Sequence, residues 1–213
     1  VPLEDHEISK ELEKSFKINV ITQSIDNLHE LAGNSTVIYM HGELNKARCI
    51  RNDLHIHQWT RDLDETHKCS RCGSQMRPHI CWFGEMPFQM DEIHQKAEQS
   101  NLFVSIGTSG EVYPAASFVS MFKEMNKPTV ELNLEPSRNQ DQFDFTIHKP
   151  ATVAVEEFKN LILKKLNEGN GQEASGLRDQ RDLLVDQLSR YIDVESVEQP
   201  GGMVDLRVGS IPI

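Results

Sequence analysis

The sequence predicts an α/β fold: a doubly wound, parallel, Rossmann-like sheet with a small inserted zinc-ribbon-like module and a C-terminal helix-hairpin appendage. Short apolar runs alternate with amphipathic helical patterns through residue 166, and this alternation is typical of parallel sheets. From about residue 47 to 85 the chain is polar, has little periodicity and contains cysteines and histidines, which indicates an inserted module. After residue 171 the composition changes again.

Four short apolar runs are the expected strands. Each is bounded by a turn residue, a polar cluster or a proline, which is typical of strands buried on both faces. They are Ile18–Thr22, Val37–Met40, Leu102–Ile106 and Thr129–Leu134. Because ligands of such sheets bind beyond the carboxyl ends of the strands, we expect the site where these runs end.

Four segments with helical periodicity lie between and around these runs. Their apolar residues recur at helical spacing, so each can cover a face of the sheet. The segments are Ile8–Phe16, Met90–Glu98, Ala115–Met125 and Val155–Leu166. We therefore expect a sheet domain over residues 1–168, a linker at 169–172 and a separate tail over 173–213.

The tail has a pattern of its own. All twelve lysines of the chain precede residue 172, so the tail differs in composition from the rest. A helical stripe followed by alternation after the turn Pro200-Gly201-Gly202 predicts a helix and then a hairpin. The stripe residues are Leu177, Leu184, Val185, Leu188, Tyr191 and Ile192, and the alternating residues are Val204, Leu206 and Val208.

Composition favours a globular protein in the cytoplasm. Hydrophobic residues make up 38% of the 213 positions and charged residues 26%, and no apolar run is long enough to cross a membrane. The net charge of −11 argues against a nucleic-acid partner, because binding to a phosphate backbone needs a basic surface. Residues Val1–Lys10 lack the basic-then-apolar pattern of a signal peptide, so a cytoplasmic address is expected.

The cysteines predict a structural metal site rather than a disulfide framework. Four cysteines in a chain of this length favour a reducing compartment, and Cys69 and Cys72 have the spacing of a metal half-site. Together with Cys49 they suggest Zn²⁺, but four ligands are expected and Asn52 stands where a second half-site would have its other cysteine. The fourth ligand could be His55, His57 or His67, and a weak site or none is the alternative. Cys81 lies in an expected strand and is a poor candidate.

His41 is the candidate general base. It follows an apolar run and precedes Gly42, which allows the backbone to turn and the imidazole to face a cleft. Histidine titrates near neutral pH and can accept a proton from a hydroxyl group. The alternative is a structural histidine in the core.

Polar residues follow the other expected strands as well. Gln23 and Asp26 come after the first run, where buried amides and carboxylates need a partner, although Asp26 could instead start the next helix. Gly107-Thr108-Ser109 follows the third run, and its backbone amides and hydroxyls suit a phosphate or ribose. Asn133-Leu134-Glu135 ends the fourth run and suits the adenosine half of a nucleotide.

Together these motifs resemble the sirtuin family of NAD-dependent protein-lysine deacylases. The resemblance covers about residues 6–166 and rests on several motifs in the family's order: Ile21–Gly33, Met40–Glu43, Gly107–Ser109 and Asn133–Glu135. Trp82–Pro87 is similar to the bacterial type. The resemblance implies transfer of an acyl group from lysine to the ADP-ribose of NAD, with release of nicotinamide, and it implies acylated-lysine proteins as substrates.

The resemblance also implies roles for individual residues. His41 matches the family's base, which makes a catalytic zinc unexpected. The implied cofactor-binding residues are Gln23, Ser24, Ile25, Asp26, Gly107, Thr108, Ser109, Asn133, Leu134, Glu135 and Ala151. The family usually has asparagine at position 24, and a serine hydroxyl is shorter and lacks the amide donors, so we expect lower activity.

The segment Arg77–Glu85 resembles the sirtuin segment on which a substrate peptide adds as a strand. Ile80, Phe83 and Gly84 are the implied substrate contacts, with Phe83 lining the acyl-lysine tunnel. A plain core strand is the alternative reading, because Trp82 and Phe83 would suit either.

One family motif is missing from the 213 residues. No G-x-G-x-x-G turn occurs in them, and the family's first strand, phosphate loop and arginine-bearing segment would lie upstream of Ile8. Without those backbone donors for the diphosphate, we expect weak NAD binding, low turnover and low stability. The acyl preference stays open.

The tail carries a second resemblance. The string Leu177–Leu188 resembles flagellar hook-associated junction proteins, whereas an ordinary helical extension is the alternative. Three functions therefore remain: an NAD-dependent deacylase, a non-catalytic module that binds NAD or ADP-ribose, and a structural flagellar fragment.

Overall fold

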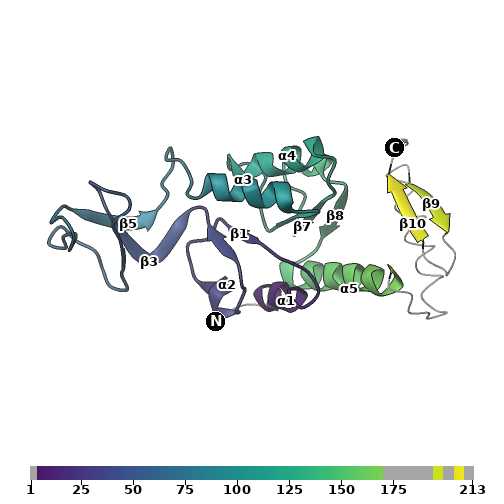
Figure 1. Cartoon of the computed structure of the whole chain (residues 1–213), viewed down its shortest axis with the longest axis horizontal. Helices are drawn as coiled ribbons and strands as arrows, with labels where there is room; N and C mark the ends of the chain where they lie inside the picture. The colour runs from purple at the N-terminus through teal and green to yellow at the C-terminus, as the bar shows by residue number, and fades with distance from the viewer. Residues whose placement is uncertain (1–3, 170–193, 199–203, 209–213) are drawn as a thin grey trace. The chain divides into compact units, whose positions relative to one another are not determined.

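The computed structural model describes residues 4–169, 194–198 and 204–208 (Figure 1). Two compact units make up the chain, Val1–Asn101 and Leu102–Ile213. Both contain parallel strands with helical connections, so the expected α/β class with parallel sheets is confirmed. In the described residues, no helix is both long and apolar enough to cross a membrane.

The N-terminal unit begins with two helices and a parallel pair of strands. Helix α1 (Glu4–Leu12) buries Ile8 and Leu12, and it contacts the short helix α2 (Leu28–Leu31). Strands β1 (Val20–Thr22) and β2 (Val37–Tyr39) pair in parallel, with Val20 opposite Val37. Both strands lie within the apolar runs expected from sequence. The unit ends with α3 (Met90–Gln99), which buries Ile93 and Ala97.

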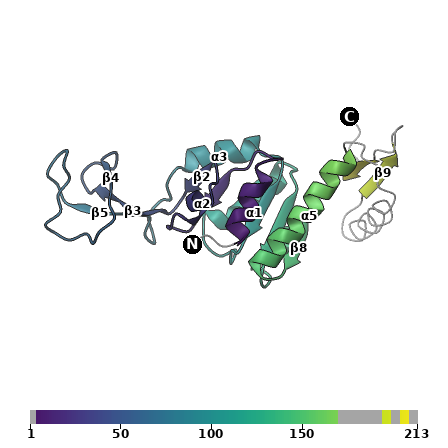
Figure 2. The same ribbon diagram turned by 90° about the horizontal axis from the view of Figure 1, so that it is seen from below.

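An antiparallel module is inserted between β2 and α3. Strands β3 (Gly42–Cys49), β4 (Ile56–Gln58) and β5 (Met76–Ile80) form a sheet in the order β4-β3-β5, and all three are labelled in Figure 2. The buried side chains of Cys49, Cys69 and Met76 pack with Trp59 and Leu63 to form its small core.

Strand β3 of this module begins at Gly42, directly after the turn that follows β2. One expectation about this segment was wrong. Cys81 lies outside a strand, since β5 ends at Ile80 and the chain then turns.

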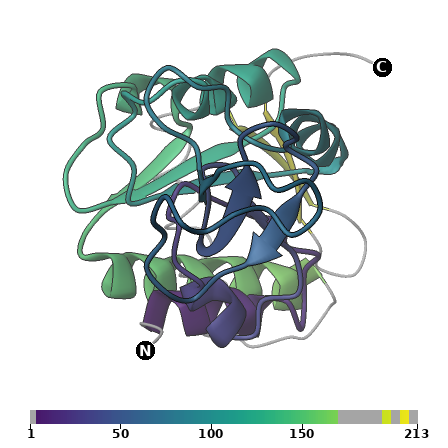
Figure 3. The ribbon, with the colours of Figure 1, turned by 90° about the vertical axis from the view of Figure 1, so that its left-hand side faces the viewer.

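The C-terminal unit is a parallel sheet with helices on both faces. Strands β6 (Phe103–Ile106), β7 (Thr129–Asn133) and β8 (Phe145–His148) pair in the order β6-β7-β8, and β8 was not expected. The 3₁₀ helix η1 (Ala115–Ser117) leads into α4 (Phe118–Glu124), a second 3₁₀ turn η2 (Gln140–Gln142) precedes β8, and α5 is Ala151–Gly169. Figures 1 and 3 show α4 and α5 on opposite sides of this sheet.

The core of this unit lies around the central strand. Leu132 on β7 is fully buried, Val119 comes from α4 and Val155 comes from α5. Phe103 stacks on Phe122, with ring centroids 5.0 Å apart. The polar residues that follow β6 and β7 are thereby held at the same edge of the sheet, because parallel strands end together.

Part of the tail is described. Strands β9 (Val194–Glu198) and β10 (Val204–Val208) pair antiparallel with Val204 opposite Glu198, which is the expected hairpin. The helix expected over residues 177–192 lies outside the described residues, as does the expected linker beyond Gly169.

Candidate functional site

His41 lies at the turn between β2 and β3. Its Nδ1 atom is 3.1 Å from the backbone carbonyl oxygen of Gln23. A carbonyl can only accept, so Nδ1 carries the hydrogen in the neutral ring and Nε2 keeps a lone pair. The carbonyl of His41 in turn accepts from the amide of Cys81 at 2.9 Å. The imidazole is therefore oriented as a proton acceptor through Nε2.

Gly42 is required by the backbone at this turn. Its φ angle is +86°, and a Cβ atom there would collide with the carbonyl oxygen of His79 and with the ring of Phe88. An L side chain is disfavoured on both grounds. Gly42 thus allows β5 to approach the residue next to His41.

The loop Gln23–Asp26 follows β1 in the same unit. The amide of Ser24 donates to Thr22 Oγ1 at 3.0 Å, and the carbonyl of Ile25 accepts from the amide of Leu44 at 2.8 Å. Asp26 Oδ1 accepts from the amide of Leu28 at 3.0 Å, so the carboxylate does help to start α2. Its other oxygen remains available to a ligand.

Tyr39 is a polar residue of this region that sequence reasoning missed. Its side chain is 6% exposed, and its hydroxyl has no hydrogen-bond partner in the described structure. Burial, followed by the nearby Glu30 carboxylate, raises the pKa of Tyr39 above its usual range. The hydroxyl therefore stays protonated and can donate a hydrogen bond.

A cleft of about 360 Å³ opens at the carboxyl ends of β6 and β7. Six of its lining residues were expected from sequence as cofactor contacts: Gly107, Thr108, Ser109, Asn133, Leu134 and Glu135. Four further lining residues were not expected: Glu111, Pro136, Ser137 and Arg138. Ala151, the remaining candidate in this unit, begins α5 and lies outside this lining.

Hydrogen bonds tie the two loops of the cleft together. Asn133 Nδ2 donates to the carbonyl of Thr108 at 2.7 Å, and the amide of Arg138 donates to the carbonyl of Ser109 at 3.1 Å. Gly110 has a φ angle of +70°, and a Cβ atom there would collide with the side chain of Asn139. The cleft is thus a preformed feature of this unit.

Glu131, on β7, holds the loop that follows this strand in place. Its carboxylate is 1% exposed and accepts from His148 Nε2 at 2.9 Å and from the hydroxyl of Ser137. A buried carboxylate is costly unless it is paired. The sequence offered one signal for it, a single charged residue between the apolar residues Val130 and Leu132 of β7.

Two exposed charges meet on the lining of the cleft. Arg138 Nε lies 2.5 Å from Glu111 Oε1, and each residue comes from a different loop. No sequence signal distinguishes them from other charged loop residues.

The loop after β5 carries the expected substrate contacts. Ile80 ends β5, whereas Phe83 and Gly84 lie in the following turn, and the side chain of Phe83 is fully exposed. That exposure does not fit a core strand, the alternative reading. Phe83 is instead free to contact a ligand.

Glu85 holds this loop in place. Its carboxylate accepts from Arg77, from Arg48 at 3.2 Å and from the amide of Trp82 at 3.0 Å. Arg77 also stacks over the Trp82 ring, 3.8 Å from its centroid. The Arg77 hydrogen bonds lower the pKa of Glu85 to about 2.

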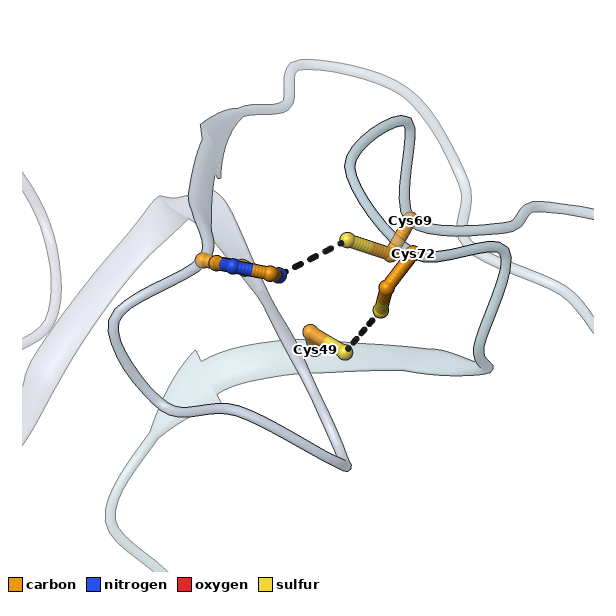
Figure 4. Close-up of side chains that lie close together, drawn as sticks. Cys49, Cys69 and Cys72 are labelled. Carbon is orange, nitrogen blue, oxygen red and sulfur yellow. Dashed lines mark hydrogen bonds between the residues drawn. The ribbon is translucent and has the colours of Figure 1, made fainter.

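The three expected cysteine ligands converge with one histidine. Cys49 Sγ and Cys72 Sγ are 3.4 Å apart, and Cys69 Sγ is 3.5 Å from His55 Nδ1. Figure 4 shows the three thiols pointing toward one another. All four ligand atoms lie within 4.8 Å of one another.

This donor set fits zinc. Zinc–sulfur and zinc–nitrogen bonds of about 2.3 and 2.0 Å place the ligand atoms of a tetrahedral site about 3.3–3.8 Å apart. Asn52 does not supply a ligand, but its carbonyl accepts from the amide of His55 at 3.0 Å and so forms the turn that delivers this histidine. His57 Nε2 is also 3.4 Å from Cys69 Sγ, whereas His67 contacts Asp64.

Two protein families match different parts of the chain. The profile of the Sir2 family matches residues 1–114. The profile of the flagellar hook-associated protein FlgK helical domain matches residues 152–212. The second match confirms the resemblance noted for the tail.

Curated relatives with the name NAD-dependent protein deacylase match the first part. The Escherichia coli protein is 48% identical over 153 residues, which is 71% of this chain and 54% of that protein. The Vibrio parahaemolyticus protein is 49% identical over 155 residues, or 72% of this chain and 64% of that protein. The chain thus spans about half the length of the first of these relatives.

Solved structures of Sir2 proteins also match this chain. A Sir2 homologue in complex with NAD matches with a TM-score of 0.70 at 30% identity, over 78% of this chain and 66% of that chain. A complex described as Sir2, p53 peptide and NAD⁺ matches with a TM-score of 0.62 at 27% identity, over 77% of this chain and 70% of that chain.

Proposed function

Because the chain belongs to the Sir2 family, we propose that it takes part in NAD-dependent protein deacylation. In this reaction an acyl group passes from a substrate lysine to ADP-ribose, and water consumption balances the products lysine, nicotinamide and acyl-ADP-ribose. The observation that carries the proposal is the orientation of His41, whose Nδ1 faces the Gln23 carbonyl and whose Nε2 is left to accept a proton.

NAD supplies the ribose that receives the acyl group and the nicotinamide that leaves. The chain's residues have three roles in this proposal: one accepts a proton, one set contacts the nicotinamide side of NAD, and another set contacts the adenosine side. His41 accepts the proton of a ribose hydroxyl, and the Gln23 carbonyl keeps its ring in the required tautomer. Gln23, Ser24, Ile25 and Asp26 contact the nicotinamide side. Gly107–Ser109, Asn133–Glu135 and, at the adenine, Ala151 contact the adenosine half.

Acylated-lysine proteins are the proposed substrates. Ile80 ends an antiparallel strand, Gly84 permits the turn that follows, and Phe83 presents a fully exposed ring. An extended peptide can bind by adding its main chain to such a segment, while an aromatic ring contacts the aliphatic stem of the lysine. Arg48 and Arg77, which hold Glu85, keep this loop in one conformation.

A structural zinc ion completes the proposal. Cys49, Cys69, Cys72 and His55 would hold it, and it would connect β3 to the turn at Cys69–Cys72. It has no part in proton transfer. A cytoplasmic location belongs to the same proposal, because the described cysteines are free thiols and a reducing compartment preserves them.

The first test is turnover with matched histidine variants. Nicotinamide release from NAD with an acetyl-lysine peptide is measured by liquid chromatography for the full chain, for His41→Asn and for His94→Asn. His94 is an exposed residue of α3 and serves as the control. We expect His41→Asn to lower acyl transfer by about 10²-fold or more, the usual range for loss of a general base, with His94→Asn unchanged.

Ser24 favours a second candidate function, a non-catalytic module that binds NAD or ADP-ribose. Its short side chain offers one hydroxyl where the family usually offers an amide. NAD binding by calorimetry without peptide-dependent nicotinamide release would support this function and contradict the enzyme. The tail match, taken by itself, would make the last part of the chain a flagellar fragment, and it says nothing of the residues before it.

A further inference from the structure

We propose that His79 is a positioning residue whose uncharged ring, through Phe88 and Arg48, fixes the loop after β5, and that a proton on His79 releases this loop. The loop comprises residues 81–87, which directly follow β5. The inference deepens the proposed function, because it makes binding of the acylated-lysine protein depend on pH. It rests on that function only for what the loop binds.

A series of ring and charge contacts leads from His79 to this loop. The imidazole stacks on the Phe88 ring, with the two centroids 4.5 Å apart. The guanidinium carbon of Arg48 lies 5.0 Å from the centroid of the same ring. Arg48 Nη2 then donates to Glu85 at 3.2 Å, and Glu85 also accepts from the amide of Trp82. His79 therefore acts on the loop through the residues that hold Glu85.

The backbone ties both ends of the loop to the turn that carries the proposed base. The amide of Phe88 donates to the carbonyl of Met40 at 2.8 Å, and the amide of Cys81 donates to the carbonyl of His41 at 2.9 Å. A change in the stack of His79 on Phe88 therefore reaches the end of the loop next to this turn.

The surroundings of His79 keep its ring uncharged. Its Nδ1 atom is buried and has no hydrogen-bond partner among the residues that the structure describes. A neutral ring can leave this nitrogen without a hydrogen, whereas a protonated ring carries a hydrogen on both nitrogens and would bury one donor unpaired. Burial, followed by the nearby charge of Arg48, lowers the pKa of His79 below its usual range.

Four charged groups on β3 and the turn after it lie near enough to shift the pKa of His79: Glu43, Lys46, Arg48 and Asp53. The two cations oppose protonation, and the two carboxylates favour it. Glu43 is already paired with Lys46 at 2.6 Å, which weakens its attraction for a proton on His79. The pKa of Glu85 is about 2, so the ion pairs of the loop keep their charges in mild acid.

Mild acid is therefore expected to release the loop. With the loop released, His79 regains the ordinary pKa of 6.5, whereas the loop in place holds its pKa lower. The contribution of His79 is thus complete above pH 6.5 and is lost as the pH falls below that value. One unit of pKa shift corresponds to about a tenfold change in the population of the released loop.

Amide hydrogen exchange measures this release. Protection factors of the Trp82 and Phe88 amides, which bond to Glu85 and Met40, are measured by nuclear magnetic resonance in the full chain at pH 7.5 and pH 5.0. We expect both factors to fall about tenfold at the lower pH. His79→Phe keeps an aromatic ring but cannot take up a proton, so its protection factors should be equal at the two pH values.

Three further variants identify the group that titrates. His79→Gln is also uncharged but has no ring to stack on Phe88, so its protection should be lower than in wild type at pH 7.5 and should not change with pH. His94→Phe replaces an exposed histidine of α3, and His41→Asn removes the neighbouring imidazole. Both of these proteins should keep the tenfold response of the wild type.

A second readout separates this inference from the function beneath it. Affinity for an acetyl-lysine peptide, measured by fluorescence anisotropy, should fall about tenfold from pH 7.5 to pH 5.0 in wild type but not in His79→Phe. Wild-type amides that stay within twofold overturn the inference, and so does a folded His79→Phe protein that keeps the tenfold change. If the amides respond as expected but the peptide binds at neither pH, the inference stands and the proposed substrate site is wrong.

Discussion

At the scale of single residues, the turn at His41 and Gly42 places the proposed base next to a glycine whose backbone conformation disfavours other residues. The histidine ring is oriented by Gln23, and the glycine after it lets β5 pass close by. We expect Gly42→Ala to destabilise the chain by about 2–4 kcal/mol, the sum of a left-handed backbone penalty and overpacking. Urea unfolding measures this change.

Gly84 provides the matched control for that variant. Its φ angle of +87° is nearly the same as the +86° of Gly42, but a Cβ atom there would meet nothing within 4 Å. Gly84→Ala should therefore show the backbone penalty alone, about 1–2 kcal/mol. Equal losses for the two variants would mean that the close approach to His79 does not matter.

The metal site gives a second prediction for single residues. His55 is grouped with the three cysteines, whereas His57 approaches Cys69 without joining that group. We expect about one zinc per chain, greatly reduced in His55→Ala and retained in His57→Ala, because a tetrahedral structural site needs all four ligands. Elemental analysis of the purified proteins after dialysis measures it. Zinc loss in His57→Ala but not in His55→Ala would assign the ligands the other way.

Elements differ in how far the sequence predicted them. Strands β1, β2, β6 and β7 follow from their apolar runs, each of which is bounded by a turn residue, a polar cluster or a proline. Strand β8 was missed because Phe145–His148 alternates apolar with polar residues and contains no continuous apolar run. The first half of β3 was missed for a related reason: exposed side chains such as Leu44 lie on it without any apolar periodicity.

The residues of the candidate site also differ in whether the sequence predicted them. Gly107–Ser109 and Asn133–Glu135 could be named because they directly follow buried strands, and the structure places them on one cleft. Glu111 and Arg138 could not, because their pairing depends on how two loops fold against each other. His55 stayed one of three candidates, since the turn at Asn52 that delivers it is set by backbone hydrogen bonds.

The loop after β5 gives a prediction at the scale of elements. Glu85 has a pKa of about 2, lowered from 4.5 chiefly by Arg77. Between pH 2 and pH 4.5 the Glu85 carboxylate binds a proton more readily in the unfolded chain than in the folded one. The stability that Glu85 contributes through its bonds to Arg77 is therefore complete above pH 4.5 and is lost as the pH falls toward 2. Unfolding free energies at pH 5 and pH 3 should therefore differ less in Glu85→Gln than in wild type. Glu65→Gln, an exposed control in the same module, should keep the wild-type difference.

At the scale of the whole molecule, the second family match begins inside a helix of the sheet domain, 38 residues after the first match ends at residue 114. The FlgK profile begins at residue 152, yet α5 (Ala151–Gly169) contacts β7 and β8 and buries Ala154 and Val155 in the C-terminal unit. By its packing, α5 belongs with the sheet that forms the cleft. We therefore expect the boundary between the sheet domain and the tail to lie after α5 rather than before it.

This division can be tested by truncation. A protein that ends at Gly169 should bind NAD within about twofold of the full chain, whereas one that ends at Pro150 should lose cooperative unfolding because it exposes the apolar core beneath α5. Calorimetry and thermal unfolding followed by circular dichroism measure the two effects. Loss of NAD binding in the longer protein would show that the tail supports the cleft.

The central claim is that an acyl group leaves lysine for ADP-ribose, and its destination is the most direct test. The full chain is incubated with NAD and an acetyl-lysine peptide, and the products are identified and quantified by mass spectrometry. The account predicts acetyl-ADP-ribose and nicotinamide in equal amounts, both lost in His41→Asn. Free acetate without nicotinamide, or an unchanged peptide in the presence of bound NAD, would contradict it.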